Sequence, residues 1–207
     1  AEVCVAAKSV AIERNVAVEN VVNFGAKFSE MERVRLIIPT EEILSALLNV
    51  FETHPVHFFS FELIFGGNFL TDSEAAILRD LIAICAPNLT YLMLNTSTTI
   101  EAKNCAFFDA VLPSCDLLRL RVLEIMIRSS SPAIETRAKQ IVSNQLSKSL
   151  ESLNICIPTM RDSVTFWSDI CHNVNCGLRF LFVEFLGIKA DVFVKAMTSM
   201  LLQFSPH

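Results

Sequence analysis

A short apolar pattern recurs along the chain. It consists of an apolar residue, two variable positions, a second apolar residue, one variable position and a third apolar residue. The fourth residues of the six copies, which we use as markers, are Val34, Phe59, Leu92, Leu123, Leu153 and Leu181. Successive markers are 25, 33, 31, 30 and 28 residues apart. So narrow a range indicates an internal repeat.

The copies alternate apolar with polar positions, which is the period of a β-strand buried on one face. In residues 150–157, Ser152 and Asn154 alternate with Leu153 and Ile155. Each copy is therefore predicted to be a strand with one face in the core and the other in contact with solvent.

The segments between the copies have the spacing of helices. In residues 41–51, Ile43, Leu47 and Phe51 fall on one face of a helix. Before the next segment, Thr71 and Glu74 form a capping box. We expect further helices over residues 73–85, 105–112, 134–146, 163–171 and 191–204, and one over about residues 5–23.

Alternating strands and helices predict parallel strands joined by right-handed crossovers. A doubly wound nucleotide-binding sheet and a solenoid both satisfy this order. The chain has only 5 glycines and neither G-x-G-x-x-G nor a P-loop. Several of its predicted strands alternate, whereas central strands of a doubly wound sheet are apolar on both faces. We therefore expect an α/β fold, a right-handed solenoid, with a helical cap over residues 1–30 and about six repeats in one domain over residues 31–207.

From Met31 to Phe204 this pattern resembles the leucine-rich-repeat superfamily in its long, ribonuclease-inhibitor-like form. The resemblance implies a horseshoe with parallel strands on the concave face, helices on the convex face and a protein partner. Degenerate arrays of this kind resemble those of F-box substrate receptors, which implies substrate recognition for a ubiquitin ligase, although these 207 residues contain no F-box. The asparagine or cysteine that follows the family pattern is missing. Its position holds Ser97, Arg128, Pro158 and Leu186.

Composition narrows the function classes. The net charge of −5 argues against nucleic acid, whose binders present basic patches. Hydrophobic residues make up 52%, but the richest apolar runs are shorter than the roughly 18–20 residues of a membrane span. The N-terminus lacks the basic region of a signal peptide, and 7 cysteines lack regular spacing. We therefore expect an intracellular protein, cytoplasmic or nuclear.

No motif indicates catalysis or a bound metal. His54 with His57, and Cys171 and His172 with Cys176, lack the four converging ligands of structural zinc. The glycines at 66 and 67 stand without a phosphate-binding lysine. We expect no metal, no cofactor and no enzymatic activity.

The alternation places a column of side chains on the exposed face of the strands. The candidate partner-binding residues are Tyr91, Met93, Glu124, Met126, Asn154 and Phe182. Aromatic residues and methionine are enriched at protein interfaces. Phe58, Phe180 and Phe182 could equally belong to the core, because a register shift of one residue exchanges the faces.

These observations favour a non-enzymatic module that binds an unidentified protein on its concave strand face. Two alternatives stay open. One is a structural subunit of a large assembly, and the other is an α/β nucleotide-binding enzyme without a recognisable motif.

Overall fold

The computed structural model describes residues 4–6, 8–65, 70–96, 101–128, 131–158, 178–186, 194 and 198. The strands are β1 (Cys4–Ala6), β2 (Ser9–Glu13), β3 (Arg33–Ile37), β4 (Ser60–Phe65), β5 (Tyr91–Thr96), β6 (Val122–Ile127), β7 (Ser152–Pro158) and β8 (Phe180–Leu186). The helices are α1 (Val18–Phe24), α2 (Glu41–Thr53), α3 (Asp72–Cys85), α4 (Glu101–Val111) and α5 (Pro132–Leu146), with 3-10 turns η1 (Gly25–Glu30), η2 (Ala86–Asn88) and η3 (Leu112–Ser114).

The strands form one sheet whose spatial order is their order in the chain. β1 is antiparallel to β2, and β2 to β8 are seven parallel strands. Leu92 pairs with Leu123, Leu123 with Leu153, and Leu153 with Leu181. The prediction of an α/β fold built from parallel strand–helix units is confirmed.

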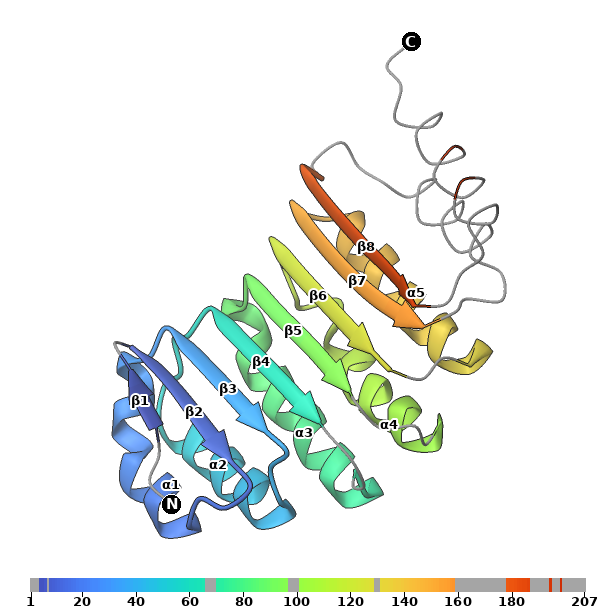
Figure 1. Ribbon diagram of the computed structural model, residues 1–207. Coiled ribbons are helices and arrows are strands. Elements are labelled where there is room, and N and C mark those ends of the chain that lie inside the picture. The colour runs from blue at the N-terminus through green and yellow to red at the C-terminus, as the bar shows by residue number, and fades with distance from the viewer. Residues whose placement is uncertain are drawn as a thin grey trace.

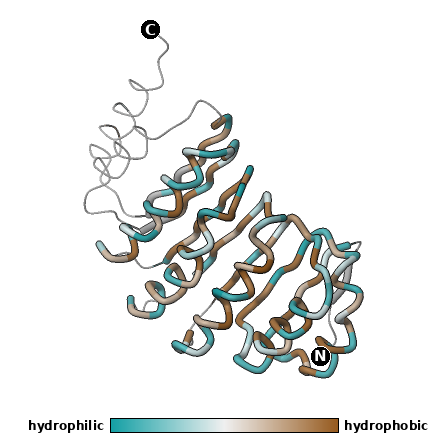
Figure 2. Tube along the Cα trace, turned by 180° about the vertical axis from the view of Figure 1, so that it is seen from behind, coloured by the Kyte–Doolittle hydropathy of each residue, from teal (hydrophilic) through white to brown (hydrophobic). Residues whose placement is uncertain are grey.

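The helices α1 to α5 lie on one face of this sheet (Figures 1 and 2). Apolar side chains from alternate strand positions meet the helices in a continuous core that extends from Val10 to Ile155. Val34, Leu36 and Leu92 are among its fully buried members. In the part of the chain that the structure describes, no helix covers the other face of the sheet, which we call the open face.

A repeated backbone contact sets the register where the parallel strands begin. The carbonyl of Glu32 accepts the N–H groups of both Phe59 and Ser60, at 3.1 and 3.2 Å. The same arrangement recurs one unit later, where the carbonyl of Phe59 accepts from Thr90 and Tyr91. The carbonyls that accept two such bonds are those of Lys8, Glu32, Phe59, Thr90, Arg121 and Glu151.

The N-terminal segment differs from the expected helix over residues 5–23. Residues 4–6 and 9–13 instead form β1 and β2, and the helical elements described within residues 1–30 are α1 and η1. Val10 and Ile12 are buried and alternate with less buried neighbours. This period of two, with β-branched residues at the buried positions, favours a strand, which pairs in parallel with β3.

The second copy of the repeat was aligned two residues too early. Phe61, not Phe59, pairs with Val34 and Leu92. Phe59 precedes β4 and is 43% exposed. Phe58, one of the residues that could have belonged to either face, is buried in the core beside Phe51 and Phe61, with ring centroids 5.6 and 5.5 Å away.

The predicted helices over residues 41–51, 73–85 and 134–146 are present as α2, α3 and α5. The capping box is confirmed: the Glu74 N–H donates to Thr71 Oγ1 at 3.1 Å, and the Thr71 N–H donates to Glu74 Oε2 at 2.7 Å. The helix expected over 105–112 begins earlier, at Glu101. The helices expected over 163–171 and 191–204 lie outside the described residues, apart from two isolated helical positions.

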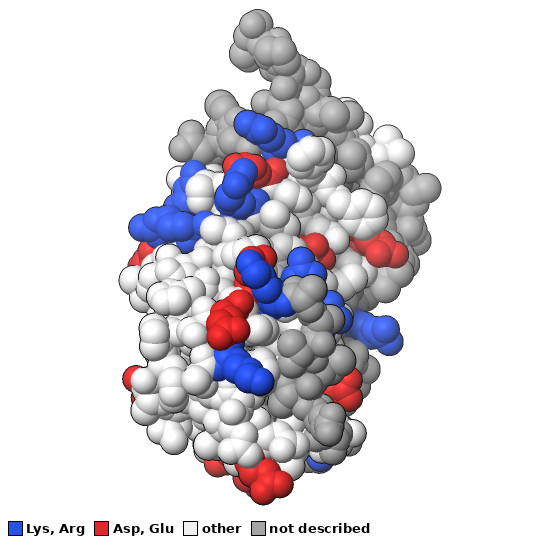
Figure 3. Space-filling view, turned by 90° about the vertical axis from the view of Figure 1, so that its left-hand side faces the viewer, with Lys and Arg blue, Asp and Glu red and all other residues white. Residues whose placement is uncertain are grey.

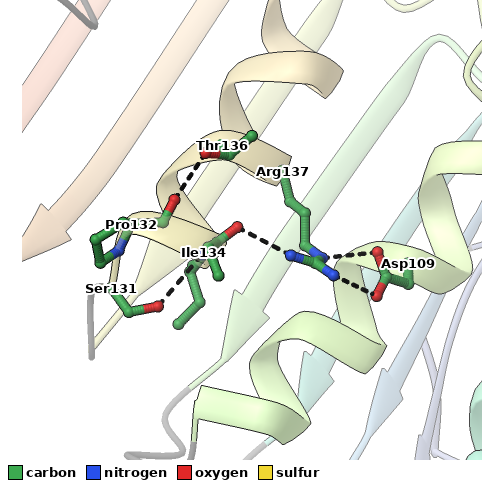
Figure 4. A network of polar contacts seen from close by, with 7 residues as sticks. Asp109, Ser131, Pro132, Ile134, Thr136 and Arg137 are labelled. Carbon is green, nitrogen blue, oxygen red and sulfur yellow. Dashed lines mark hydrogen bonds and ion pairs between the residues drawn. The ribbon is translucent and has the colours of Figure 1, made fainter.

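Polar side chains hold neighbouring helices together on the covered side. Arg137 of α5 donates to both carboxylate oxygens of Asp109 in α4, from Nε at 2.7 Å and from Nη2 at 2.9 Å (Figure 4). Ser131 caps α5 by accepting from the Ile134 N–H. Bidentate pairing of this kind restricts how one helix can rotate against the next.

One buried amide joins α5 to the loop before β6. Gln145 is fully buried, accepts from the Leu120 N–H at 3.3 Å and donates to the Cys115 carbonyl at 3.0 Å. We predict that Gln145→Leu lowers the free energy of unfolding by about 2 kcal/mol, because the Leu120 N–H then loses its partner in the core. Urea denaturation measures this. The control Arg79→Gln, in an exposed pair with Asp80, should change stability by less than about 0.5 kcal/mol; an equal loss in both variants would contradict the prediction.

Candidate binding surface

The parallel register brings side chains of the open face into three rows that run across the strands. The first row is Arg33, Ser60, Tyr91, Val122, Ser152 and Phe180. The second row is Arg35, Glu62, Met93, Glu124, Asn154 and Phe182. The third row is Ile37, Ile64, Asn95, Met126, Cys156 and Glu184.

All six candidate residues predicted from the sequence lie in these rows. Met93, Glu124, Asn154 and Phe182 are consecutive neighbours in the second row, while Tyr91 lies in the first and Met126 in the third. Whether they contact a partner stays a prediction.

The two phenylalanines of β8 resolve one alternative that the sequence left open. Phe180 is 68% exposed and Phe182 is 57% exposed. Both therefore belong to the open face and not to the core.

A buried carboxylate organises the β3–β4 end of the open face. The Glu62 side chain is only 3% exposed. Arg35 donates from Nε to Glu62 Oε2 at 2.5 Å, and Arg33 Nε lies 3.6 Å from Glu62 Oε1. Because an unpaired buried carboxylate is costly, these arginines are what permits Glu62 to remain in the sheet.

Tyr91 lies between this cluster and Glu124. Burial, followed by the negative charge and hydrogen bond of Glu124 and the charge of Glu62, raises the pKa of its phenol above the ordinary value, while Arg33 acts in the opposite direction. The phenol therefore keeps its proton well into the alkaline range.

A shallow depression of about 270 Å³ opens where β4, β5 and β6 begin. The residues that line it include Arg33, Ser60, Tyr91 and Arg121. Ser60 is 1% exposed, and its Oγ has no hydrogen-bond partner among the described residues. Arg121 pairs with Glu151 through two bonds of 3.0 Å.

The far end of the open face is more apolar. Asn95 Nδ2 lies 3.7 Å from Met126 Sδ, and Asn154 Oδ1 is buried without a partner among the described residues.

Burial and the hydrogen bond to Glu184 raise the pKa of the Cys156 thiol, and burial raises the pKa of the Cys115 thiol, which lies in the core, to about 11. These cysteines stay protonated at neutral pH and are poor nucleophiles.

The residues considered for metal binding show no assembled site. In the described ranges, no three His, Cys, Asp or Glu side chains gather closely enough to hold an ion. His54 Nδ1 lies 2.9 Å from Thr53 Oγ1, at the end of α2. The cluster at Cys171, His172 and Cys176 and the glycines at 66 and 67 lie outside the described residues.

The distribution of charged side chains and the hydropathy of the helices indicate no further binding site in the described residues. Viewed from the β1 and α1 end, Lys and Arg side chains lie among Asp and Glu side chains (Figure 3). None of the helices described is both long and apolar enough to cross a bilayer.

The sequence predicted the column of exposed residues but not the contacts within it. Arg35 and Glu62 are 27 residues apart, and their pairing follows only from the true register of β3 with β4. The sequence did contain a signal for this pairing, because Arg33 and Arg35 in one repeat correspond to Ser60 and Glu62 in the next. The alignment of the second copy two residues too early hid this correspondence.

Comparisons with known proteins identify no family. No family model matches the chain, and no curated protein does. A solved DUF72 family protein from Enterococcus faecalis matches over 95% of this chain and 98% of that chain, with 11% identity and a TM-score of 0.27. A similarity this weak supports no transfer of fold or activity.

The resemblance to the leucine-rich-repeat superfamily was wrong. No family model matches the chain, that of the leucine-rich repeats included. The physical reason is that the short apolar pattern describes any parallel strand that is buried on one face and followed by a helix. The residue that would be specific to the family, the asparagine or cysteine of the turn, is the one this chain lacks.

Ser60 provides a test of its unpartnered hydroxyl. We predict that Ser60→Ala leaves the free energy of unfolding unchanged or raises it by up to about 1 kcal/mol, because a buried donor without a partner is removed. The matched control is Thr96→Val, since Thr96 Oγ1 donates to buried Asn104; it should cost about 1–2 kcal/mol. A similar loss for Ser60→Ala in urea denaturation would show that its hydroxyl is bonded.

Tyr91 is the single tyrosine of the chain, so ultraviolet absorbance reports its ionisation alone. We predict a midpoint above the ordinary pKa of 10 in the folded protein, and a lower midpoint in Glu124→Gln. Because folding raises this pKa, the stabilisation is complete below about pH 10 and is lost as the pH rises through the folded-state value. Tyr91→Phe should lack this alkaline loss. An ordinary midpoint in the folded protein would contradict the assigned environment.

Proposed function

We propose that this protein is a non-enzymatic binding module whose open face recognises another protein. The observation that carries the proposal is the exposure of Phe180 and Phe182. Apolar area left in water costs about 25 cal/mol per Å², and clustered exposed apolar side chains are typical of interaction sites.

The composition of the second row supports the same proposal. Met93 is a flexible apolar side chain that adapts to different partners. Glu124 and Asn154 are polar neighbours that can fix the orientation of a partner through hydrogen bonds. The combination of an aromatic residue, methionine and a few directional polar groups is typical of a protein interface.

We further propose that the strand–helix units are the turns of a right-handed solenoid. Support comes from the sequential strand order and from the even spacing of paired positions, since successive partners in the second row from Arg35 to Phe182 are 27–31 residues apart. In such an array each unit contacts its neighbours and presents one strip of a continuous surface.

We propose an intracellular location, cytoplasmic or nuclear, because four cysteines are free thiols and form no disulfide. Cys85, Cys105, Cys115 and Cys156 are free. Unpaired cysteines in apolar surroundings are typical of proteins from a reducing compartment.

The experiment is affinity capture with the full chain, followed by measurement of the dissociation constant of the purified partner. We predict that Phe182→Ala weakens binding about tenfold or more, and that Met93→Ala combined with Met126→Ala does the same, with nearly unchanged melting temperatures. Arg79→Gln, on the helix side, should bind normally.

Two results would overturn this function. Equal binding by wild type and both open-face variants would place the interface elsewhere. A shift in melting temperature with nucleotides, absent with other small molecules, would favour the enzyme alternative.

A further inference from the structure

The depression at the start of β4, β5 and β6 holds more hydrogen-bond donors than acceptors. Ser60 lies at its base, between Arg33 and Tyr91 in the first row. The Ser60 side chain shares the open face because the next residue, Phe61, is buried in the core. Its Oγ is buried without a hydrogen-bond partner among the described residues, although the residue lines the depression.

Arg33 adds a positive charge that the protein uses only in part. Its side chain is 52% exposed, and its Nε lies 3.6 Å from Glu62 Oε1, beyond hydrogen-bond distance. Arg35 makes the short contact to the same carboxylate. Within the described ranges, no residue is seen to pair with the terminal guanidinium nitrogens of Arg33.

The carboxylate among the lining residues is already engaged. Glu151 accepts both bonds from Arg121, at 3.0 Å each. Nearby, the carboxylate of Glu62 is held by Arg35. What the depression lacks is an acceptor for Ser60 and Arg33.

We propose that the depression binds the side-chain carboxylate of an aspartate or glutamate in an acidic segment of the protein partner. This inference rests on the proposed function and adds the chemistry of one contact. The carboxylate accepts from Ser60 Oγ and from the terminal nitrogens of Arg33. Half-exposed Phe59 and Val122 provide apolar surface for the methylene groups of the bound residue.

Charge favours a carboxylate over a phosphate group. Arg33 and Arg35 carry two positive charges against the one carboxylate of Glu62. The carboxylates of Glu124 and Glu151 lie close by. A singly charged ligand matches one guanidinium, whereas a doubly charged phosphate would leave a second negative charge close to three carboxylates. A lysine or arginine of a partner is disfavoured because the groups left free are donors.

The test uses random peptides displayed on phage, selected on the immobilised full chain, and then synthesised with a fluorescent label for anisotropy. Selected peptides should be enriched in aspartate or glutamate. Changing that residue to its amide should weaken binding to the wild type about tenfold, Arg33→Gln should do the same, and Ser60→Ala should weaken binding about threefold. Arg79→Gln, on the covered side, should stay within about twofold.

A double-mutant cycle makes the assignment specific. The amide peptide should bind Arg33→Gln no more weakly than the acidic peptide does, because the two changes remove the same contact. Independent, additive losses would overturn the proposal. A phosphoserine peptide that binds the wild type more tightly than its glutamate counterpart would also overturn it.

The outcomes separate this contact from the proposed function. If peptides lose affinity for the Phe182 or Met93 variants but not for Arg33→Gln or Ser60→Ala, the carboxylate site is wrong and the proposed binding face still stands. Peptides that are indifferent to every open-face variant, or failure to select any peptide, would count against both.

Discussion

The arrangement depends on one backbone contact that recurs at the start of each parallel strand from β3 to β8. A carbonyl of one unit accepts two N–H groups from the first residues of the next, as Thr90 does for Arg121 and Val122. This contact fixes where each strand begins relative to its neighbour. Since side chains alternate with a period of two, a slip of one residue would reverse the two faces of the sheet. The open face is therefore a consequence of register, and its rows would not exist without it.

That register places a carboxylate, that of Glu62, at a buried position of the sheet. Glu62 lies in the second row between Arg35 and Met93, where water reaches it poorly. Removal of a carboxylate from water is unfavourable unless its charge is compensated. Two arginines on the neighbouring strand supply the compensation, and they do so because the ladder aligns Arg33 and Arg35 with Ser60 and Glu62. The same alignment places Ser60 beside Arg33, where its hydroxyl has no hydrogen-bond partner among the described residues.

The fold could be predicted from the sequence where burial follows a simple period. Leu92, Leu123, Leu153 and Leu181 stand in clean alternation and do form one ladder. Residues 9–13 were mistaken for helix because a strand of five residues gives too few periods to distinguish 2 from 3.6.

The phenylalanines near β4 were harder still, because Phe58, Phe59 and Phe61 all have the composition of a strand core. Only packing against Phe51 and the pairing with Val34 decide which of them is buried. The candidate site was predictable as a column, since alternation alone exposes it. The ion pairs were not, because they join residues one repeat apart, and an error of two residues in alignment misplaces every partner.

The chemistry of the open face changes along the direction in which the strands stack, and under the proposed function this gradient restricts how a partner segment can lie. At β3 and β4 the exposed groups are the guanidinium groups of Arg33 and Arg35, and the buried carboxylate of Glu62 is already paired. At β8 they are Phe180, Phe182 and the exposed carboxylate of Glu184. A segment that places an acidic residue over Ser60 and apolar side chains over Phe182 meets complementary groups at both ends. The reversed segment would set its acid against Glu184 and its apolar residues against charged guanidinium groups, which opposes both electrostatics and desolvation. In the proposed complex, the difference between the two ends determines the orientation of the segment, and the number of strands that it crosses determines how many side chains it contacts.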